Sequence, residues 1–509
     1  MPQIREIELK LAINPADAAA FRMLHLLRQK VIDAPKRRKV FNTYFDTPEL
    51  AIKQRGMALR LRKIGGKWLQ TLKTAGTATG GLHQRGEWEY PLRVPQLDLA
   101  LFAQTPLAKL PGSNQLHLTL QPAFTTNFYR TTWQIEVSPG QRVEVALDQG
   151  VIRCGESESV ISEVEIEQLE GSPVAVFDLA TSLLDHIALI PEMRSKAERG
   201  YRLFQPEPHT ARHPCSIQLK RKWSPHQAML AIVAECLSHF DANVEGAIAS
   251  DDPEYIHQLR VALRRLHSAM RIFKPADAGS IDEELKWLAA TLGNARDWDV
   301  LVTETLPALL TAYGDAGFAS EIIDAAKKGQ LGARKGARVA LVSKRYALLA
   351  MSIGRWSRGA ANLTLSAVPP VDLVIPHETG EEKKLTEFAS REIRRRHRRL
   401  LRSIVPLAEQ PSEARHQVRI DAKRLRYAVD FFASIFNKKR VARYLKILEK
   451  IQEGLGETND DAVAMALLEE LATSESFNSF AKGWFAARSR AKLAGMGKEF
   501  SDIKSVKRF

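Results

Sequence analysis

Residues 6–10 read EIELK, and this alternation of charged and apolar residues is typical of a β-strand. Successive side chains of a strand point to opposite faces, so Glu6, Glu8 and Lys10 share one face. Two carboxylates that lie close together repel each other unless an opposite charge or a metal ion lies among them. The opening strand therefore predicts a charged face that meets a ligand.

The same alternation recurs through the first 210 residues, where Gly or Pro often separates the segments. Helical patterns interrupt at about 15–30 and 173–188. We expect a mainly antiparallel β structure with flanking helices. The predicted strands are 4–13, 38–46, 57–64, 67–74, 84–92, 124–137, 142–153, 159–169 and 196–204.

The charges on these strands are sorted by sign. Some strands carry Arg and Lys on one face, and others carry almost only carboxylates, as in SEVEIE at 162–167. If the strands close into a barrel with these faces inward, both sets meet in one lumen. Arg and Lys suit phosphate oxygens, while grouped carboxylates suit Mg²⁺ or Mn²⁺. The alternative is that these faces are the solvated sides of half-buried strands.

Composition and charge restrict the class of protein. The chain has 509 residues, 45% apolar and 26% charged, so at about 150 residues per domain it predicts two to four domains. We find no uncharged apolar run of about 18 residues and no signal peptide, which predicts no membrane segment. Three cysteines without CxxC spacing argue against a disulfide scaffold or a zinc site. We expect a cytoplasmic protein.

The net charge of +15 is unevenly placed. Residues 1–210 hold 26 Lys and Arg against 23 Asp and Glu, whereas residues 211–509 hold 48 against 36. The second part is therefore suited to a polyanion such as nucleic acid, an anionic membrane or polyphosphate.

The organisation changes after residue 205. The proline-rich stretch 206–217 predicts a linker, and from about 224 the periodicity is helical. HQLRVALRRLHSAMRIF (257–273) with LGNARDWDV (292–300) is repeated as HQVRIDAKRLRYAVDFF (416–432) with LGETNDDAV (455–463). The His-to-LG spacing is 35 and 39 residues. Two paired motifs in one order indicate a duplication. We expect an all-α domain over 218–509 with similar bundles at about 218–365 and 381–509, separated by a non-helical stretch at 366–380.

Each copy of the repeat predicts an amphipathic helix with a basic stripe. At 100° per residue, His257, Arg260 and Arg264 fall on one side, away from the leucines, and His416, Arg419 and Lys423 do the same. A third basic segment, REIRRRHRRLLR (391–402), adds Arg395 and Arg398. Like charges at this spacing cost roughly 0.2–0.5 kcal/mol per pair, which favours an anionic ligand over a merely solvated face. Metal binding by the histidines is a further alternative, although no ligand-spaced His or Cys accompanies them.

Residues 1–205 resemble the CYTH, or triphosphate tunnel metalloenzyme, superfamily. The resemblance rests on the ordered set ExExK, LRLRK, TLK, EVEIE and SKxxRG. It implies a closed antiparallel barrel that forms a tunnel and acts on triphosphates or makes cyclic AMP. It implies Glu6 and Glu8 as metal ligands and Lys10 as a triphosphate contact. Lys73 and Glu165 complete the implied catalytic set. No arginine matches the family's strand-end position near FNTYFDT, where Phe41 stands. The implied substrate contacts are Lys10, Arg60, Arg62, Lys73, Arg85, Arg130 and Lys196, and the implied metal ligands are Glu6, Glu8, Asp148 and two of Glu163, Glu165 and Glu167.

Residues of about 218–505 resemble the CHAD family, a conserved-histidine helical domain. The match lies in HxxRxxxRRL at 257–266, HxxRxxxKRL at 416–425 and LGxxRDxDV at 292–300. It implies binding of inorganic polyphosphate in a basic channel between two bundles. Asp297 and Asp460 are interpreted as residues that orient the basic side chains, with helix capping as the alternative. The implied contacts are His257, Arg260, Arg264, His416, Arg419 and Lys423, with Arg395, Arg398 and Arg338 as weaker candidates.

Together these features predict a cytoplasmic inorganic triphosphatase that uses Mg²⁺ or Mn²⁺ and also binds long-chain polyphosphate, with polyphosphate granules as a further expected location. The alternatives are an adenylyl cyclase, a thiamine or nucleoside triphosphatase, and a non-catalytic polyphosphate-binding protein. Nucleic acid is disfavoured because the basic stripes lack interleaved aromatic residues. Chain-length preference, oligomeric state, the metal and any coupling between the domains are open at this level.

Overall fold

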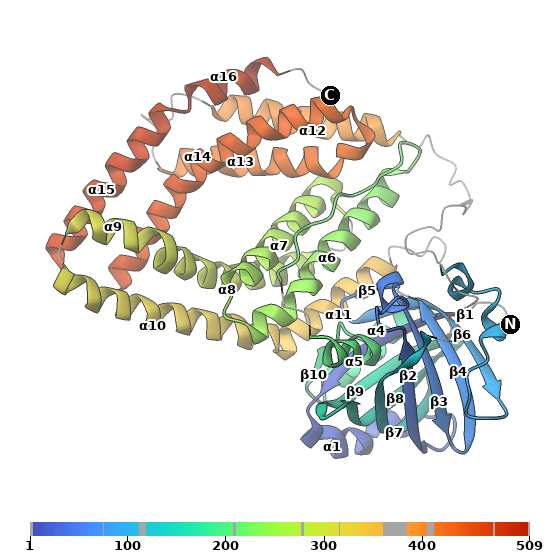
Figure 1. The fold of residues 1–509 in the computed structure, drawn as a ribbon. Helices are drawn as coiled ribbons and strands as arrows, with labels where there is room; N and C mark the ends of the chain where they lie inside the picture. Colours follow the sequence, from blue (N-terminus) through green and yellow to red (C-terminus); the bar gives the residue numbers. More distant parts are fainter. Residues whose placement is uncertain are drawn as a thin grey trace. The chain divides into compact units, whose positions relative to one another are not determined.

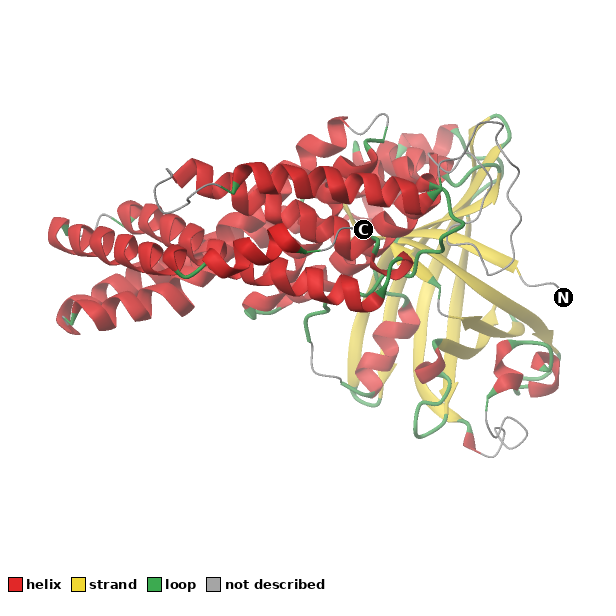
Figure 2. Cartoon of the chain, turned by 90° about the horizontal axis from the view of Figure 1, so that it is seen from above, coloured by secondary structure: helices red, strands yellow, loops and turns green. Residues whose placement is uncertain are grey.

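The computed structural model describes residues 4–74, 76–110, 119–206, 210–275, 279–314, 316–359, 384–404, 412–471 and 474–506. The chain forms two compact units. Met1–Thr210 and Val342–Leu365 make the first, and Ala211–Leu341 and Ser366–Phe509 make the second. Figure 2 shows that the strands gather in the first unit and that helices build the second. No described helix is long and apolar enough to cross a membrane.

The first unit is built on a closed antiparallel barrel (Figure 1). In the order β1-β9-β8-β7-β2-β3-β4-β6, eight described strands pair with their neighbours, and β6 pairs back onto β1. The short strands β10 and β5 extend β1 and β6. The strands are β1 (Ile4–Ile13), β2 (Lys36–Asp46), β3 (Met57–Ile64), β4 (Lys67–Thr74), β5 (Thr77–Thr79), β6 (Leu82–Leu92), β7 (Gln121–Ser138), β8 (Gln141–Cys154), β9 (Ser157–Glu170) and β10 (Leu189–Pro191).

The predicted strands up to residue 169 are confirmed, with ends that differ by at most a few residues. The segments 4–13, 57–64 and 67–74 match β1, β3 and β4 residue for residue. β5 and β10 were not predicted, because three residues are too few to show an alternation.

On β1 the charged side chains face the lumen and the apolar side chains face outward. Leu9 and Leu11 of β1 are fully buried, in a core cluster that covers the outside of the barrel. Phe21, Val176 and Phe177 pack into this cluster from helices. Burial of these apolar faces under helices leaves the opposite face of each strand to line the lumen. The helices are α1 (Ala18–Met23), α2 (His25–Gln29) and α4 (Val174–Leu184).

The prediction of a strand at 196–204 is wrong, because this segment is helix α5 (Lys196–Phe204). Ser195 and Glu198 form a reciprocal capping box that starts the helix. Tyr201 packs against the lumen-facing Phe124 and Phe128 in one buried cluster. Helix α5 therefore covers one end of the barrel.

A second difference concerns residues 342–359. The sequence places them in the helical domain of 218–509, but helix α11 (Lys344–Gly359) belongs to the barrel unit. Ala350 and Met351 join the core cluster around α4. Arg355 pairs with Asp178 at 2.6 Å. The predicted domain boundaries and linker are otherwise a proposal, and the stretch 366–380 lies outside the described residues.

The second unit is helical, as predicted from residue 224 onward. Ser224 caps α6 with a capping box, and Pro225 is its first residue. A π-helical turn at Leu301–Thr305 follows α8. The helices are α6 (Pro225–Ala249), α7 (Pro253–Phe273), α8 (Gly279–Val300), α9 (Leu306–Tyr313), α10 (Ala316–Leu341), α12 (Leu385–Ser403), α13 (Ser412–Phe431), α14 (Lys438–Glu470), α15 (Glu475–Ala494) and α16 (Gly497–Ser505).

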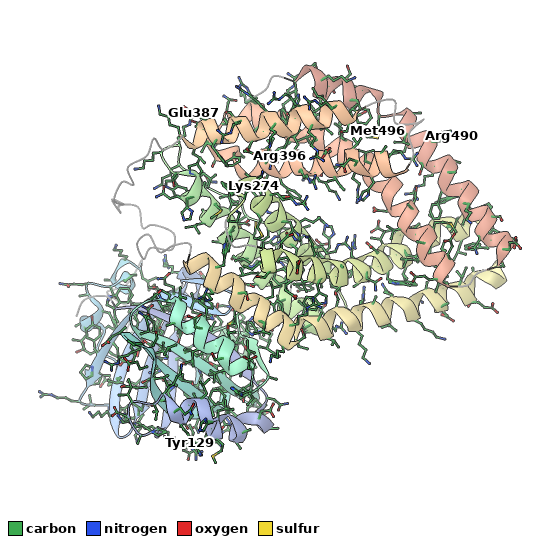
Figure 3. The ribbon with its side chains drawn as sticks, turned by 180° about the vertical axis from the view of Figure 1, so that it is seen from behind. Tyr129, Lys274, Glu387, Arg396, Arg490 and Met496 are labelled. Carbon is green, nitrogen blue, oxygen red and sulfur yellow. The ribbon has the colours of Figure 1, made fainter. Side chains whose placement is uncertain are left out.

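The duplicated motifs occupy equivalent helix pairs. The first copy lies on α7 and the end of α8, and the second lies on α13 and α14. Helix α7 contacts α8 and α13, while α14 contacts α13 and α8. The two copies thus pack together within one unit, and Figure 3 shows Lys274 just beyond α7 and Arg396 on α12.

Candidate active site and a basic helical surface

The charged residues predicted from alternate strand positions do lie on one face, inside the barrel. The strand register places Glu6 opposite Arg85, Lys10 opposite Glu165, and Asp148 opposite both Arg130 and Glu163. Directly paired residues of neighbouring strands share a face, so these groups meet in the lumen. The solvated-face alternative is therefore excluded for these residues. Helix α5 adds Lys196.

One group of lumen charges lies around Glu6. Lys73 Nζ is 2.8 Å from Glu6 Oε2 and 3.2 Å from Glu87 Oε2. Arg85 bridges Glu6, at 3.1 Å, and Glu8. Arg60 lies 3.5 Å from Glu87. Cations from β3, β4 and β6 thus alternate with carboxylates from β1 and β6.

A second group is an acid triad that consists of Asp148, Glu163 and Glu165. One carboxylate oxygen of each lies within 4.8 Å of the others, and all three side chains are buried. Lys10 links the two groups because it pairs with Glu165 and, at 3.0 Å, with Glu8. Arg130 makes a bidentate contact with Asp148, at 2.8 and 2.6 Å, and reaches Glu165. Glu6 and Glu8 are not part of this triad.

The ion pairs decide the pKa values of the paired acids. Burial by itself would raise the pKa of Glu6, but Lys73 and Arg85 outweigh it and hold that pKa below its usual range. In the same way Lys10, Lys196 and Arg130 hold the pKa of Glu165 well below its usual range against its burial. The pKa of Glu87 is lowered to about 2. These carboxylates are therefore ionised at neutral pH, and the lumen keeps both signs of charge.

Glu167 differs from its neighbours on β9. The register sets it opposite Glu8 and Glu144, with carboxylates on both sides. Burial and then the charges of Glu6 and Glu8 raise the pKa of Glu167 to about 8. Of the three glutamates of EVEIE, Glu163 and Glu165 lie in the acid triad and Glu167 lies apart from it.

The acid triad fits a hard divalent cation. Its donors are three carboxylates, which are the ligands that Mg²⁺ and Mn²⁺ prefer, and a buried low-dielectric position strengthens their attraction for a metal ion. The donor set does not distinguish Mg²⁺ from Mn²⁺.

Several lumen residues were missed from the sequence. Asn42 of β2 faces inward and accepts a hydrogen bond from Arg62 Nε at 2.9 Å, while the neighbouring Phe41 points to the other face. Arg199 of α5 reaches Glu163 at 3.2 Å. The alternation in FNTYFDT was a signal for Asn42. Arg199 is the arginine of the SKxxRG motif, which was the signal for it, although no role was predicted for it from the sequence.

The helical unit holds a separate basic cluster. Arg260 donates to Asp297 at 3.0 Å and to the carbonyl of Gly293. In the second copy Arg419 lies 3.7 Å from Asp460. Asp297 lies in the last turn of α8 and Asp460 lies in the interior of α14, so N-capping does not explain either residue. That they orient the two arginines stays a prediction, and the ion pairs are consistent with it.

The two basic stripes converge. The charges of Arg264 and Arg419 act on Lys423, which places side chains of α7 and α13 in one electrostatic neighbourhood. Burial, and then Arg419 and Arg264, lower the pKa of Lys423 to about 7. Burial and Arg296 likewise lower the pKa of His257 to about 4. Crowded cations that lower the pKa of a neighbour are common at functional sites.

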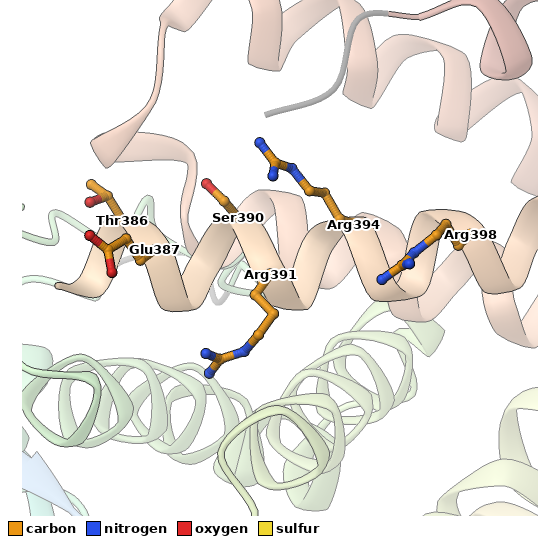
Figure 4. A pocket seen from close by; sticks show the side chains of 6 residues that line it. All are labelled: Thr386, Glu387, Ser390, Arg391, Arg394 and Arg398. Atoms are coloured by element: carbon orange, nitrogen blue, oxygen red, sulfur yellow. The ribbon is translucent and has the colours of Figure 1, made fainter. Parts of the chain in front are cut away.

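The weaker candidates lie elsewhere in this unit. Arg398 lines a pocket of about 480 Å³ along α12, with Arg391 and Arg394 (Figure 4). Arg395 is exposed and pairs with Glu392 at 2.9 Å. Arg338 pairs with Asp251 at 2.6 Å. His416, which is one of the six main implied contacts and not a weaker candidate, is exposed near the start of α13.

Comparisons with known proteins agree with this division. Residues 5–201 match the family model of the CYTH domain, and residues 231–469 match that of the CHAD domain. An inorganic triphosphatase of Haemophilus influenzae is 37% identical over 202 residues, which are 39% of this chain and 55% of that protein. This chain thus matches little more than half of that relative's length.

A solved structure resembles the helical unit. The CHAD domain of the plant Ricinus communis covers 59% of this chain and 99% of its own, with 29% identity and a TM-score of 0.51. Both family matches fall on the residues whose motifs carried the resemblance. The chain therefore contains a CYTH domain followed by a CHAD domain.

Proposed function

We propose that the barrel hydrolyses inorganic triphosphate to diphosphate and phosphate. The observation that carries the proposal is the buried lumen in which Lys and Arg side chains from several strands lie beside ionised carboxylates. A triphosphate with its metal ion carries both signs of charge, and such a lumen complements both. The family match and the Haemophilus influenzae relative support the same reaction.

The cations of the lumen bind and orient the phosphate chain. Arg60, Arg62, Lys73 and Arg85 come from three neighbouring strands, so they present donors along one side of the barrel. Fixed donors that point into a water-poor lumen stabilise the charge that develops on the leaving diphosphate. Lys10, Arg130 and Lys196 present donors to the phosphate chain from the other side of the lumen.

The acidic residues hold the divalent ion. We assign Asp148, Glu163 and Glu165 as ligands. Glu8 and Glu6 are assigned as further ligands; Lys10 contacts both Glu8 and Glu165, and Arg85 contacts both Glu8 and Glu6. When bound, Mg²⁺ or Mn²⁺ neutralises phosphate charge and lowers the pKa of a bound water. Helix α5 keeps bulk water from one end of the lumen.

The test is phosphate release from tripolyphosphate by the full chain with Mg²⁺ or Mn²⁺. Glu8→Ala should lower kcat/KM at least about a hundredfold, because a preorganised charge at the reacting centre is lost. Glu158→Ala removes an exposed carboxylate of the same barrel and is the matched control. A wild-type protein that releases no phosphate with any divalent metal contradicts the proposal.

The same assay separates the alternatives. ATP, thiamine triphosphate and long-chain polyphosphate are offered in parallel with tripolyphosphate. Preferred turnover of thiamine triphosphate or ATP assigns the barrel to those substrates, and formation of cyclic AMP from ATP assigns it to the cyclase reaction.

We also propose that the helical unit binds long-chain inorganic polyphosphate. The supporting observation is the convergence of Arg260, Arg264, Arg419 and Lys423 from the two copies, with a lowered Lys423 pKa. Repeated cations along two helices suit a repeated anion. His257 and His416 are assigned as further contacts, and Arg395 and Arg398 as peripheral ones.

Binding is tested by titration of the full chain with long-chain polyphosphate at fixed salt. Arg264→Gln should weaken binding about tenfold, whereas Arg153→Gln, which removes an exposed arginine of the barrel, should not. Polyphosphate should displace duplex DNA readily. Easy displacement of polyphosphate by DNA contradicts the assignment and favours nucleic acid. A cytoplasmic location at polyphosphate granules is tested by microscopy of a fluorescent fusion.

A further inference from the structure

The acid triad has an internal cation. Lys196 Nζ lies 2.7 Å from Asp148 Oδ2, 2.5 Å from Glu163 Oε1 and 3.0 Å from Glu165 Oε1. Its ammonium is thus within ion-pair distance of all three carboxylates. Its side chain is 8% exposed.

The other nearby cations are bound differently. Arg130 contacts two of the three acids, and Lys10 shares its charge between Glu165 and Glu8. Of the three acids Arg199 contacts only Glu163, and it also donates to Ser159 at 3.1 Å and to the carbonyl of Val160. Among the described residues, Lys196 Nζ has no polar partner outside the triad.

Three buried carboxylates this close require positive charge between them, because their mutual repulsion is weakly screened in the interior. The ammonium supplies it at the point that is equidistant, to within 0.5 Å, from one oxygen of each acid. A divalent ion bound by the same oxygens needs them at about 2.0–2.6 Å. The ion and the ammonium would then occupy the same volume, and only one of them can be there.

We propose that Lys196 is an exchangeable counter-ion, which neutralises the acid triad in the metal-free protein and leaves it when a divalent ion binds. Lysine suits this role because its charge is a point on a flexible four-carbon stem. Lys196 is the first residue of α5, so its stem starts outside the strands and can swing without a change of the barrel. The displaced ammonium stays in the lumen, where phosphate oxygens are its next partner.

The exchange of Lys196 for a divalent ion has two consequences, and the second of them rests on the proposed triphosphatase function. First, the affinity for metal alone is lowered by the cost of displacing Lys196. Second, the metal ion and triphosphate bind with positive cooperativity, because the phosphate chain pairs with the ammonium that the metal ion displaces.

The test measures Mn²⁺ binding by calorimetry on the full chain, without triphosphate. Lys196→Met should bind Mn²⁺ at least about tenfold more tightly than wild type, since the ammonium that competes for the triad is gone. Lys39→Met, which removes an exposed lysine of β2, is the matched control and should leave the affinity unchanged. Unchanged or weaker Mn²⁺ binding in Lys196→Met overturns the proposal.

A second measurement, of thermal stability, applies even if Lys196→Met does not fold without metal. Without Lys196 the metal-free triad is under-neutralised, so the thermal midpoint of Lys196→Met should fall, and Mn²⁺ should raise it by more than it raises the wild-type midpoint. If the variant is unfolded without metal, Mn²⁺ alone should refold it, as followed by circular dichroism. Failure of Mn²⁺ to restore the variant contradicts the exchange. Because no triphosphate is used, this result is independent of whether the barrel is a triphosphatase.

Discussion

At the scale of single residues, both units contain buried or half-buried charged side chains whose ionisation is set by close neighbours. In the barrel, cations keep buried acids such as Glu6 and Glu165 ionised. In the helical unit, crowded cations disfavour the charged form of one of their own group, Lys423. Burial and the like charges of Arg419 and Arg264 lower the pKa of Lys423 to about 7. Its charge therefore titrates near neutral pH, whereas a solvated lysine stays charged there.

This titration predicts a pH dependence of polyphosphate binding. Below pH 7 Lys423 is protonated and attracts the anion, and above pH 7 the free protein holds it neutral. Affinity should therefore fall about tenfold between pH 6 and pH 9, the effect of losing one ion contact at a half-buried site. His257, with a pKa of about 4, stays neutral over this range and adds no slope.

The measurement is a set of binding isotherms at constant ionic strength, with Lys423→Arg as the control. An arginine at this position should stay charged and flatten the profile. A wild-type affinity that does not change with pH, or a slope that survives in Lys423→Arg, would rule out Lys423 as its source.

At the scale of elements, helix α5 closes one end of the lumen and carries Lys196 into it. A capping box starts it and Tyr201 O–H donates to Asp46 at 2.9 Å, which ties the helix to the end of β2. Gly200 brings it close to the barrel, because a Cβ there would lie 2.0 Å from the ring of Phe124. The glycine thus permits the helix to seat against the lumen-facing aromatic residues.

Gly200→Ala should therefore destabilise the barrel unit by about 1–3 kcal/mol through overpacking, although alanine is the better helix former. The check is thermal or urea unfolding followed by circular dichroism. Gly483→Ala on α15, where a Cβ meets nothing within 4 Å, is the control and should be neutral or mildly stabilising. An equal gain of stability in both variants would show that α5 is not tightly seated.

At the scale of the whole molecule, the first unit is not one continuous piece of chain. Helix α11 follows the first bundle in sequence but completes the core cluster outside the barrel. Gly354 of α11 contacts the ring of Phe177 so closely that a Cβ there would lie 2.2 Å from it. Ala347, Ala350 and Met351 are buried in the same place.

A fragment of residues 1–210 should consequently be less stable than the same unit in the full chain. It should also expose the apolar face of α4 and bind a hydrophobic dye. Each fully buried side chain of this size contributes about 1.5–3 kcal/mol, so the loss of Met351 and its neighbours lowers the unfolding midpoint measurably. A synthetic peptide of residues 342–359 added to the fragment should reverse both changes. A fragment that binds no dye and unfolds at the same temperature as the unit in the full chain would contradict this role of α11.

Much of this architecture follows from local patterns. Alternation predicted the strands and the shared face of Glu6, Glu8 and Lys10, since successive side chains of a strand point to opposite faces. Helical periodicity and the paired motifs likewise predicted the two copies in the second unit. These features depend on neighbours in the chain, and a single sequence records them.

Other features needed the tertiary structure. The grouping of Asp148, Glu163 and Glu165 depends on strand register, and the place of Lys196 among them depends on a helix that begins 31 residues after Glu165. No periodicity of the sequence encodes either. The prediction of a strand at 196–204 is wrong because the residue pattern of this segment also fits a strand. The capping box and the packing on Phe124 make it a helix. Helix α11 joins the barrel unit because burying its small apolar face against α4 is more favourable than leaving it exposed, a choice that is made in three dimensions.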